Sequence, residues 1–205
     1  GDKKVGKMFS SKVSPTIADD IKTESFWAVI GSMIVVFLYI LLRFKRWQFS
    51  LGAVTAVIHD VIIVLGIFSF TYSFMPFSME IDQAFIAAIL TVIGYSLNDT
   101  VVVFDRIREN NRLMPGASNG EIINRSINET LSRTIMTSLT VFLTILILFL
   151  VGGEVTKGFA FAMLIGVITG IYSSVFVAAP ILVDIGSKKA LDENVGHPEI
   201  KKQPV

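Results

Sequence analysis

The sequence predicts an all-α membrane protein built around a bundle of five transmembrane helices. Hydrophobic residues make up 52% of the 205 residues, Phe occurs 16 times, and the mean hydropathy is +0.66. A soluble chain of this length does not need so many apolar side chains for its core. Five apolar segments stand out, each close to the roughly 20 residues that cross a bilayer as a helix. Their expected bounds are 26–42, 51–74, 84–104, 134–151 and 158–183.

The first segment ends in a short basic joint, and the second carries two polar residues at depth. Arg43, Lys45 and Arg46 follow the first segment, which is how a hydrophobic helix leaves a bilayer on its cytoplasmic side. His59 and Asp60 interrupt the second segment. An ionisable side chain inside a span is a candidate functional residue, although both could still reach water from the cytoplasmic third of their helix.

The third segment carries the strongest functional signal. Asn98 and Asp99 lie inside the apolar run, and about five helical residues, roughly 7.5 Å of rise, separate Asp99 from Phe104. An ionisable residue at a helix centre costs roughly 2.5 to 3.5 kcal/mol on insertion scales. A charged run follows, in which we expect Asp105 to reach water: Asp105, Arg106, Arg108, Glu109 and Arg112.

An amphipathic helix is predicted between the third and fourth segments. Pro115 and Gly116 indicate a turn, and Ser118 with Glu121 three residues later fits a capping box that starts a helix. Apolar residues then recur every four positions, at Ile123, Ile127 and Leu131. This pattern is typical of a helix that lies along the membrane surface or against its neighbours. A packed connector to the fourth segment is the favoured interpretation, and a surface for docking a partner is the alternative.

The fourth segment begins with Arg133, and Thr137 and Ser138 follow roughly on its face. We expect the Arg133 guanidinium and the carboxylates of Asp60 and Asp99 to form a hydrogen-bonded cluster inside the bundle, because an unpaired charge there is far more costly than a paired one. His59, Asn98, Thr137 and Ser138 are expected to support the cluster. Alternatively, the Arg133 head lies in the phosphate layer, as terminal arginines often do.

The fifth segment carries a small residue at every fourth position. These positions are Ala162, Gly166, Gly170, Ser174 and Ala178, called the small-residue ridge below. Lipid gives no hydrophobic drive for helix association, so a ridge of this kind lets another helix backbone approach closely. We therefore expect a packing role and not a ligand site.

The positive charges predict the orientation of the bundle. Twelve Lys and Arg fall on one side of the membrane: Arg43, Lys45, Arg46, Arg106, Arg108, Arg112, Arg125, Arg133, Lys188, Lys189, Lys201 and Lys202. Only Lys157 falls in the two opposite loops. The C-terminus is therefore expected in the cytoplasm and the N-terminus outside.

Three regions are expected along the chain. Residues 1–24 are predicted to be the end of an exterior domain and a linker, 25–185 the transmembrane bundle, and 186–205 a cytoplasmic tail that is disordered. Gly1 follows no initiator Met, so we expect a piece of a longer protein. The sequence contains no Cys, which excludes thiolate metal sites and disulfides, and nothing in it indicates a nucleic-acid partner.

A long stretch of the third segment resembles the signature of the SecF family of protein-export membrane proteins. The residues that carry the resemblance are Gly94, Tyr95, Ser96, Asn98, Asp99, Thr100, Phe104, Asp105, Arg106, Arg108 and Glu109. Residues 39–46, the His59-Asp60 pair and residues 131–138 resemble further motifs of the family. Residues 13–15 depart from its Val-Gly-Pro motif, because Ser14 replaces the Gly.

The resemblance implies a member of the resistance-nodulation-division superfamily in the bacterial inner membrane. SecD and SecF of this superfamily each supply six helices and a periplasmic domain, so this chain would be the last five helices of the SecF half, whether separate from SecD or fused to it. The implied function is proton-gradient-driven assistance of preprotein export at SecYEG. The implied partners are SecD, SecYEG, the translocating preprotein, lipid, and also YajC and YidC, with protons as the coupling ion and no other cofactor.

The resemblance also assigns roles within the cluster. Asp99 and Arg133 match positions implicated in proton passage, and Asp60 matches the His-Asp motif. Protonation of Asp99 would break its pairing with Arg133, and the uncompensated guanidinium would then have to move or find another acceptor. Protonation would thus bias a bundle with two conformations.

Two other classes of function stay open. An intramembrane aspartyl protease would use Asp60 and Asp99 as a dyad that shares one proton, although the Gly-x-Gly-Asp setting of such enzymes is absent. A passive scaffold would need only the small-residue ridge. Carboxylates within one hydrogen bond of each other would favour the protease. An Asp99 that faces lipid or lies in a dry, fully paired site would favour the scaffold. An Asp99 near Arg133 beside a water-accessible path would favour proton use.

Overall fold

The computed structural model describes residues 15–185, which form an all-α bundle. The elements are α1 (Pro15–Phe44), α2 (Trp47–Thr71), α3 (Gln83–Leu113), α4 (Asn119–Val151), α5 (Glu154–Ser173), the π-helical segment η1 (Ser174–Ala178) and α6 (Ala179–Ile185). Five helices are long and apolar enough to cross a membrane, and the fifth combines α5, η1 and α6. The predicted fold class is confirmed. The predictions for residues 1–14 and for the tail, 186–205, lie outside the described residues.

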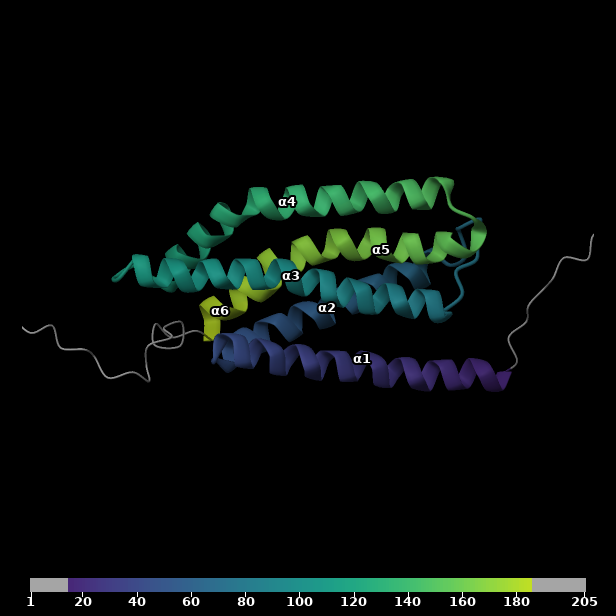
Figure 1. Ribbon diagram of the computed structural model, residues 1–205, viewed down its shortest axis with the longest axis horizontal. Coiled ribbons are helices and arrows are strands. Elements are labelled where there is room, and N and C mark those ends of the chain that lie inside the picture. The colour runs from purple at the N-terminus through teal and green to yellow at the C-terminus, as the bar shows by residue number, and fades with distance from the viewer. Residues whose placement is uncertain (1–14, 186–205) are drawn as a thin grey trace, which may run out of the picture.

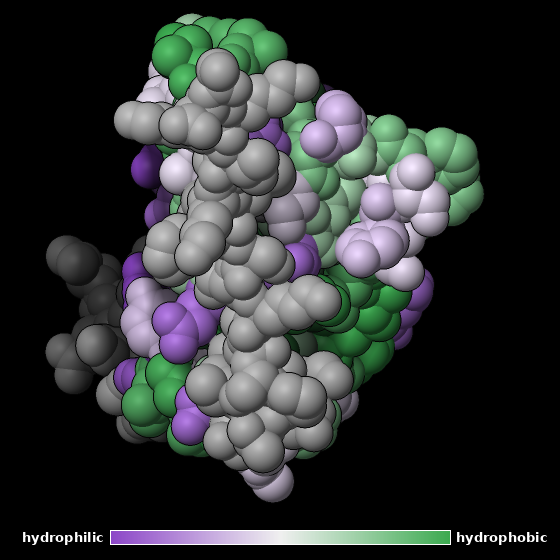
Figure 2. Space-filling view, turned by 90° about the vertical axis from the view of Figure 1, so that its right-hand side faces the viewer, coloured by the Kyte–Doolittle hydropathy of each residue, from purple (hydrophilic) through white to green (hydrophobic). Residues whose placement is uncertain are grey.

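The long helices run roughly along one direction (Figure 1). The α1–α2 and α3–α4 connections and α6 lie at one end of the bundle, called the basic end below. The α2–α3 and α4–α5 connections lie at the opposite end. Helix α3 contacts α2, α4 and α5, and α1 packs mainly on α2 and α3. Seen from the end opposite the basic end, hydrophobic side chains cover broad parts of the visible surface, as expected where helices face lipid (Figure 2).

Two predicted boundaries differ from the structure. Helix α1 begins at Pro15, so residues 15–24 continue the first spanning helix, which was expected to start near residue 26. Proline suits the first position of a helix, and no Gly or Pro interrupts residues 16–24. The amphipathic segment is continuous with α4 and not a separate helix. It packs against α3, as the favoured interpretation of a packed connector predicted. With 33 residues, α4 is about 50 Å long, well beyond the roughly 30 Å of a hydrocarbon core.

The start of α4 has the predicted capping box. The Glu121 amide donates to Ser118 Oγ at 3.3 Å, and the Ser118 amide donates to Glu121 Oε2 at 2.8 Å. Helix α3 also has a side-chain cap, since Asp82 Oδ1 accepts from the Phe85 amide at 2.8 Å. These acceptors satisfy amides that have no partner within the helix.

Aromatic contacts join the helices at the basic end. Phe44 of α1 stacks on Phe49 of α2 with ring centroids 4.9 Å apart, and Phe104 of α3 meets both rings edge-on. The tight turn between α1 and α2 places Lys45 at φ 55°, in the left-handed region. The three rings are fully buried, so they fix the ends of three helices against one another.

The small-residue ridge faces α3. A Cβ at Gly166 would overlap the side chain of Val92, and a Cβ at Gly170 would lie 3.2 Å from Ser96 Cβ. Ala162, Ser174 and Ala178 are fully buried. Helices α3 and α5 thus approach more closely at these positions than larger side chains would allow.

We expect Gly166→Val to lower the thermal stability of the purified protein, because the added methyl groups must displace Val92 from the α3–α5 interface. Overpacking of this kind costs roughly 1 to 3 kcal/mol. Gly31→Val is the matched control, since a Cβ at Gly31 meets nothing within 4 Å. The measurement is the fraction that elutes as intact protein in size-exclusion chromatography after heating. Equal heat resistance of the two variants would contradict the packing role.

Candidate proton site: two buried carboxylates

Asp60 of α2 is fully buried and joins three helices. Its Oδ2 accepts hydrogen bonds from Ser96 Oγ of α3 at 2.5 Å and from Ser173 Oγ of α5 at 2.7 Å. Its Oδ1 lies 3.1 Å from Nδ1 of the neighbouring His59, whose ring stacks on Tyr172 of α5. Both oxygens of this carboxylate therefore have partners, and the carboxylate ties α2 to α3 and α5.

Asp99 of α3 is only 3% exposed but has far fewer partners. Its Oδ2 accepts from Ser138 Oγ of α4 at 3.2 Å. The same Ser138 hydroxyl accepts from the Tyr95 hydroxyl at 2.9 Å. This chain of hydrogen bonds links α3 to α4. Among the described residues Asp99 has one side-chain donor, whereas Asp60 contacts three side chains.

The two carboxylates form two separate sites and not the single predicted cluster. Asp60 binds to donors on α3 and α5, whereas Asp99 binds to a donor on α4. Ser96 and Asp99 are three residues apart on α3, so one helix contributes to both sites. Since no hydrogen bond joins Asp60 to Asp99 within residues 23–185, the shared-proton dyad of an aspartyl protease is not formed there.

Arg133 does not form the expected ion pair. Its side chain is exposed at the surface of α4, and within the described part of the chain it makes no ion pair with Asp99. The guanidinium is still near enough for its charge to act on the Asp99 carboxylate. The physical reason for the separation is the helix geometry: Ser138, which holds Asp99, lies five residues beyond Arg133 and therefore about 140° around the helix.

Of the four polar residues expected to support the cluster, one contacts each carboxylate and two contact neither. His59 contacts Asp60 and Ser138 contacts Asp99, as described above. Asn98 is exposed on α3. Thr137 is exposed as well, and its hydroxyl donates to the backbone oxygens of Arg133 and Thr134, both at 3.0 Å.

The charged end of the signature forms a network at the basic end. Asp105 pairs with Arg43 at 3.0 Å and with Arg108 at 3.5 Å. Arg106 contacts Glu109 at 2.5 Å and Glu129 of α4 at 2.6 Å. The Arg106 hydrogen bond is the largest cause that lowers the pKa of Glu129 to about 2. Asp105 is half-exposed, as predicted, and belongs to neither carboxylate site.

Ser173 is the contributor that the sequence analysis missed. It lies beside Ser174 of the small-residue ridge, and both hydroxyls are fully buried. A hydroxyl in an otherwise apolar span next to a packing ridge was the available signal.

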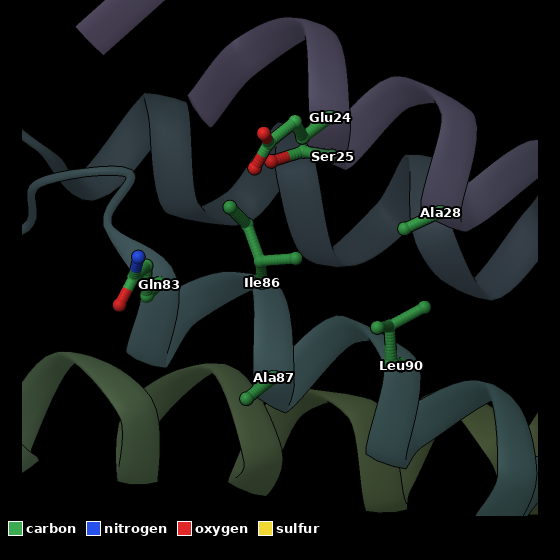
Figure 3. A pocket seen from close by; sticks show the side chains of 7 residues that line it. All are labelled: Glu24, Ser25, Ala28, Gln83, Ile86, Ala87 and Leu90. Carbon is green, nitrogen blue, oxygen red and sulfur yellow. The ribbon is translucent and has the colours of Figure 1, made fainter. Parts of the chain in front are cut away.

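A groove of about 280 Å³ between α1 and α3 lies away from both carboxylates. Glu24 and Ser25 of α1 face Gln83 and Ile86 of α3 across it (Figure 3). Among the α3 residues that line the groove, Leu90 is nearest to Asp99, at about 13.5 Å along the helix axis.

Among the described residues, no group of three or more His, Cys, Asp or Glu is placed to hold a metal ion.

The sequence profile of the family described as "Protein export membrane protein SecD/SecF, C-terminal" matches residues 2–188. The chain belongs to this family. The match includes all the helices that the structure describes, and so the segments that carry Asp60 and Asp99.

Individual members of the family are closely similar. The chain is 52% identical to a protein translocase subunit SecF of Rhodothermus marinus over 87% of its own length and 58% of the relative's. It is 47% identical to a protein translocase subunit SecDF of Brucella abortus, over 86% of this chain and 22% of that one. The crystal structure of a translocon-associated SecDF from Thermus superimposes with a TM-score of 0.77 at 42% identity, covering 84% of this chain and 23% of that one. The chain thus spans just over half the length of the SecF relative.

We expect Asp60→Ala to destabilise the bundle more than Ser138→Ala. The first change removes three contacts of one buried carboxylate, those with Ser96, Ser173 and His59. It leaves the buried Ser96 hydroxyl without its acceptor, which costs about 1 to 3 kcal/mol. The second removes two hydrogen bonds between α3 and α4, those of Ser138 with Asp99 and with Tyr95, each worth about 1 kcal/mol. Thermal unfolding of both variants in the same detergent compares them. A smaller loss for Asp60→Ala would contradict the three-helix role of this carboxylate.

Proposed function

We propose that this chain is the membrane part of a SecF-type subunit that uses the proton gradient to assist preprotein export by the Sec translocase. The relatives named as SecF and SecDF translocase subunits support the role in Sec-dependent export. The observation that carries proton use is Asp99, a buried carboxylate in a span with a single hydroxyl donor. Such a group can gain and lose a proton without dismantling the interface between helices.

Arg133 and Asp60 take different roles in this proposal. Arg133 acts on Asp99 through its charge. In the proposed mechanism the two residues pair directly in a second conformation of the bundle. Asp60 holds α2, α3 and α5 together, so its part in the relay is to keep α3 in position. One charge that crosses 100 mV releases about 2.3 kcal/mol, which is comparable to the cost of breaking one buried polar contact.

SecD is the proposed partner within the membrane. SecDF relatives join both names in one chain, and Asn98 exposes an amide near the middle of a spanning helix. A polar side chain at this depth is costly against lipid, so this face of α3 suits contact with another protein. SecYEG and the preprotein are proposed as the wider partners, with YajC and YidC resting on the family resemblance.

A passive scaffold is the second candidate function. The fully bonded Asp60 and the packed small-residue ridge favour it, because both stabilise the bundle without any change of charge. We do not propose an enzymatic activity, since the relatives are named as translocase subunits and the two carboxylates share no donor among the described residues.

The decisive prediction concerns Asp99→Asn in the full-length complex. Asparagine keeps the size and can still accept from Ser138, but it cannot cycle between charge states. We expect normal assembly, intact ATP-driven transport and loss of the export increment that depends on the proton gradient, measured in membrane vesicles. Arg133→Lys should lose part of that increment, because Lys keeps the charge without the planar fork.

Asp105→Asn is the matched control, because this carboxylate lies on the same helix but outside both sites. Its gradient-dependent export should equal that of the wild type. Full gradient-dependent export by Asp99→Asn would leave the scaffold as the better account.

The proposed orientation gives a second prediction. The basic end should face the cytoplasm, since it carries the Arg and Lys of the α1–α2 and α3–α4 connections. In a full-length protein without other cysteines, Ser78→Cys should react with an impermeant maleimide added outside intact cells, and Gly120→Cys should not. Both positions are exposed, so access to the reagent decides the result. The reverse labelling pattern would overturn the orientation.

A further inference from the structure

Four buried hydroxyls follow one face of α4 from Asp99 toward the basic end. Ser138, Thr134, Thr130 and Ser126 recur every four residues, with exposures of 0%, 2%, 8% and 0%, and are called the hydroxyl row below. Ser138 donates to Asp99 at one end of the row. Residues four apart lie close together on a helix surface, so the row follows one buried side of α4, and both of its ends contact α3.

Thr134 differs from the other members of the row. Ser126 and Thr130 donate to backbone oxygens of their own helix, those of Ile122 at 2.7 Å and Ser126 at 2.9 Å. Thr134 Oγ1 has no hydrogen-bond partner among the described residues, although it is buried.

Packing does not account for this hydroxyl. A buried hydroxyl without a partner is destabilising, whereas the isosteric Val carries no such cost. The exposed Thr137, Thr140 and Thr144 of the same helix all donate to backbone oxygens, so this helix does offer its threonines acceptors. Stability would favour Val at position 134, and the hydroxyl therefore needs another reason.

The row ends in a polar network that reaches the surface. Asn110 Nδ2 of α3 donates to Ser126 Oγ at 3.0 Å and to Glu129 Oε2 at 2.7 Å. Glu129 is partly exposed and also accepts from Arg106 and Arg125. The row thus connects the buried Asp99 to charged groups at the basic end.

We infer that the hydroxyl row carries protons between Asp99 and the basic end of the bundle, with Thr134 as the step that makes the row continuous. The inference rests on the proposed proton role of Asp99, and it names the side of the membrane with which Asp99 exchanges its proton. In the orientation proposed above, that side is the cytoplasm.

The distance between neighbouring hydroxyls of the row determines whether a proton passes directly or through water. Cβ atoms four residues apart lie about 5 to 6 Å from each other, which is too far for most direct hydroxyl bonds and suits one water molecule between neighbours. The proton leaves the Asp99 carboxyl for Ser138 Oγ, that hydroxyl passes its own proton to the next water, and the sequence repeats through Thr134. One proton crosses, Asp99 becomes a carboxylate, and no group is oxidised or reduced.

Glu129 stays ionised throughout this transfer. The pKa of about 2 makes it a poor proton store, so it serves as the acceptor that holds Asn110 beside Ser126. Protons therefore pass from the row into bulk water at the basic end.

The test uses the full-length complex in vesicles, with a pH-sensitive dye to follow proton flux during preprotein transport. Thr134→Val keeps the shape and removes the hydroxyl, and we expect the Asp99-dependent flux to fall about tenfold, the effect of losing one hydrogen bond in the transfer path. Thermal stability should stay equal or rise, which a structural role of the hydroxyl would not allow. Thr134→Ser should restore the flux. Thr140→Val, an exposed threonine of the same helix, is the matched control with wild-type flux.

The outcomes separate this inference from the proposed function. If Asp99→Asn abolishes flux but Thr134→Val transports protons like the wild type, the hydroxyl row is wrong and the proton role of Asp99 stands. If Asp99→Asn keeps wild-type flux, the proposed function fails and the row fails with it. Poor assembly of Thr134→Val would show that the hydroxyl has a structural partner, and would also overturn the inference.

Discussion

The close approach of α3 and α5 is the constraint on which both carboxylate sites depend. Gly166 and Gly170 offer α3 a surface without Cβ atoms, and this brings Ser96 and Ser173 within hydrogen-bond distance of the same Asp60 oxygen. Lipid supplies no hydrophobic drive for such contact, so van der Waals packing and the shared carboxylate must hold the helices together. The fixed position of α3 in turn presents Asp99 to Ser138 on α4.

The two buried carboxylates are chemically identical but differ in their number of hydrogen-bond partners. Asp60 has contacts on both oxygens, and a change in its charge would disturb three helices at once. Asp99 has one donor on one neighbouring helix, so a change in its charge alters mainly the α3–α4 interface. Because Ser96 and Asp99 are neighbours on α3, the contacts of Asp60 also help to fix the part of α3 that carries Asp99.

Hydropathy and charge predicted the five spans, and the intramembrane carboxylates stood out because such residues are costly in lipid. The sequence does not set the rotation of each helix about its axis, and this decides which helix a polar side chain faces. For that reason Asp60, Asp99 and Arg133 were expected in one cluster. For the same reason Ser173 was overlooked, and Asn98 was expected in the interior of the bundle. The start of α1 at Pro15 was missed because hydropathy was used to place the first helix. Residues 15–24 are mostly polar, so they lengthen the helix but not the apolar segment.

Two of the predicted functional residues, Asn98 and Arg133, have exposed side chains, and this bears on how the site works. An amide or a guanidinium on a spanning helix is costly against hydrocarbon, so each needs a polar neighbour, water or the phosphate layer. In the proposed assembly with SecD, protein contacts can supply such neighbours on the surface of α3. The charge of Arg133 acts on Asp99 without a direct bond, so a small rotation of α4 would change their interaction strongly. In the proposed mechanism, protonation of Asp99 favours one rotation over the other, which gives the two states that coupling to a gradient requires.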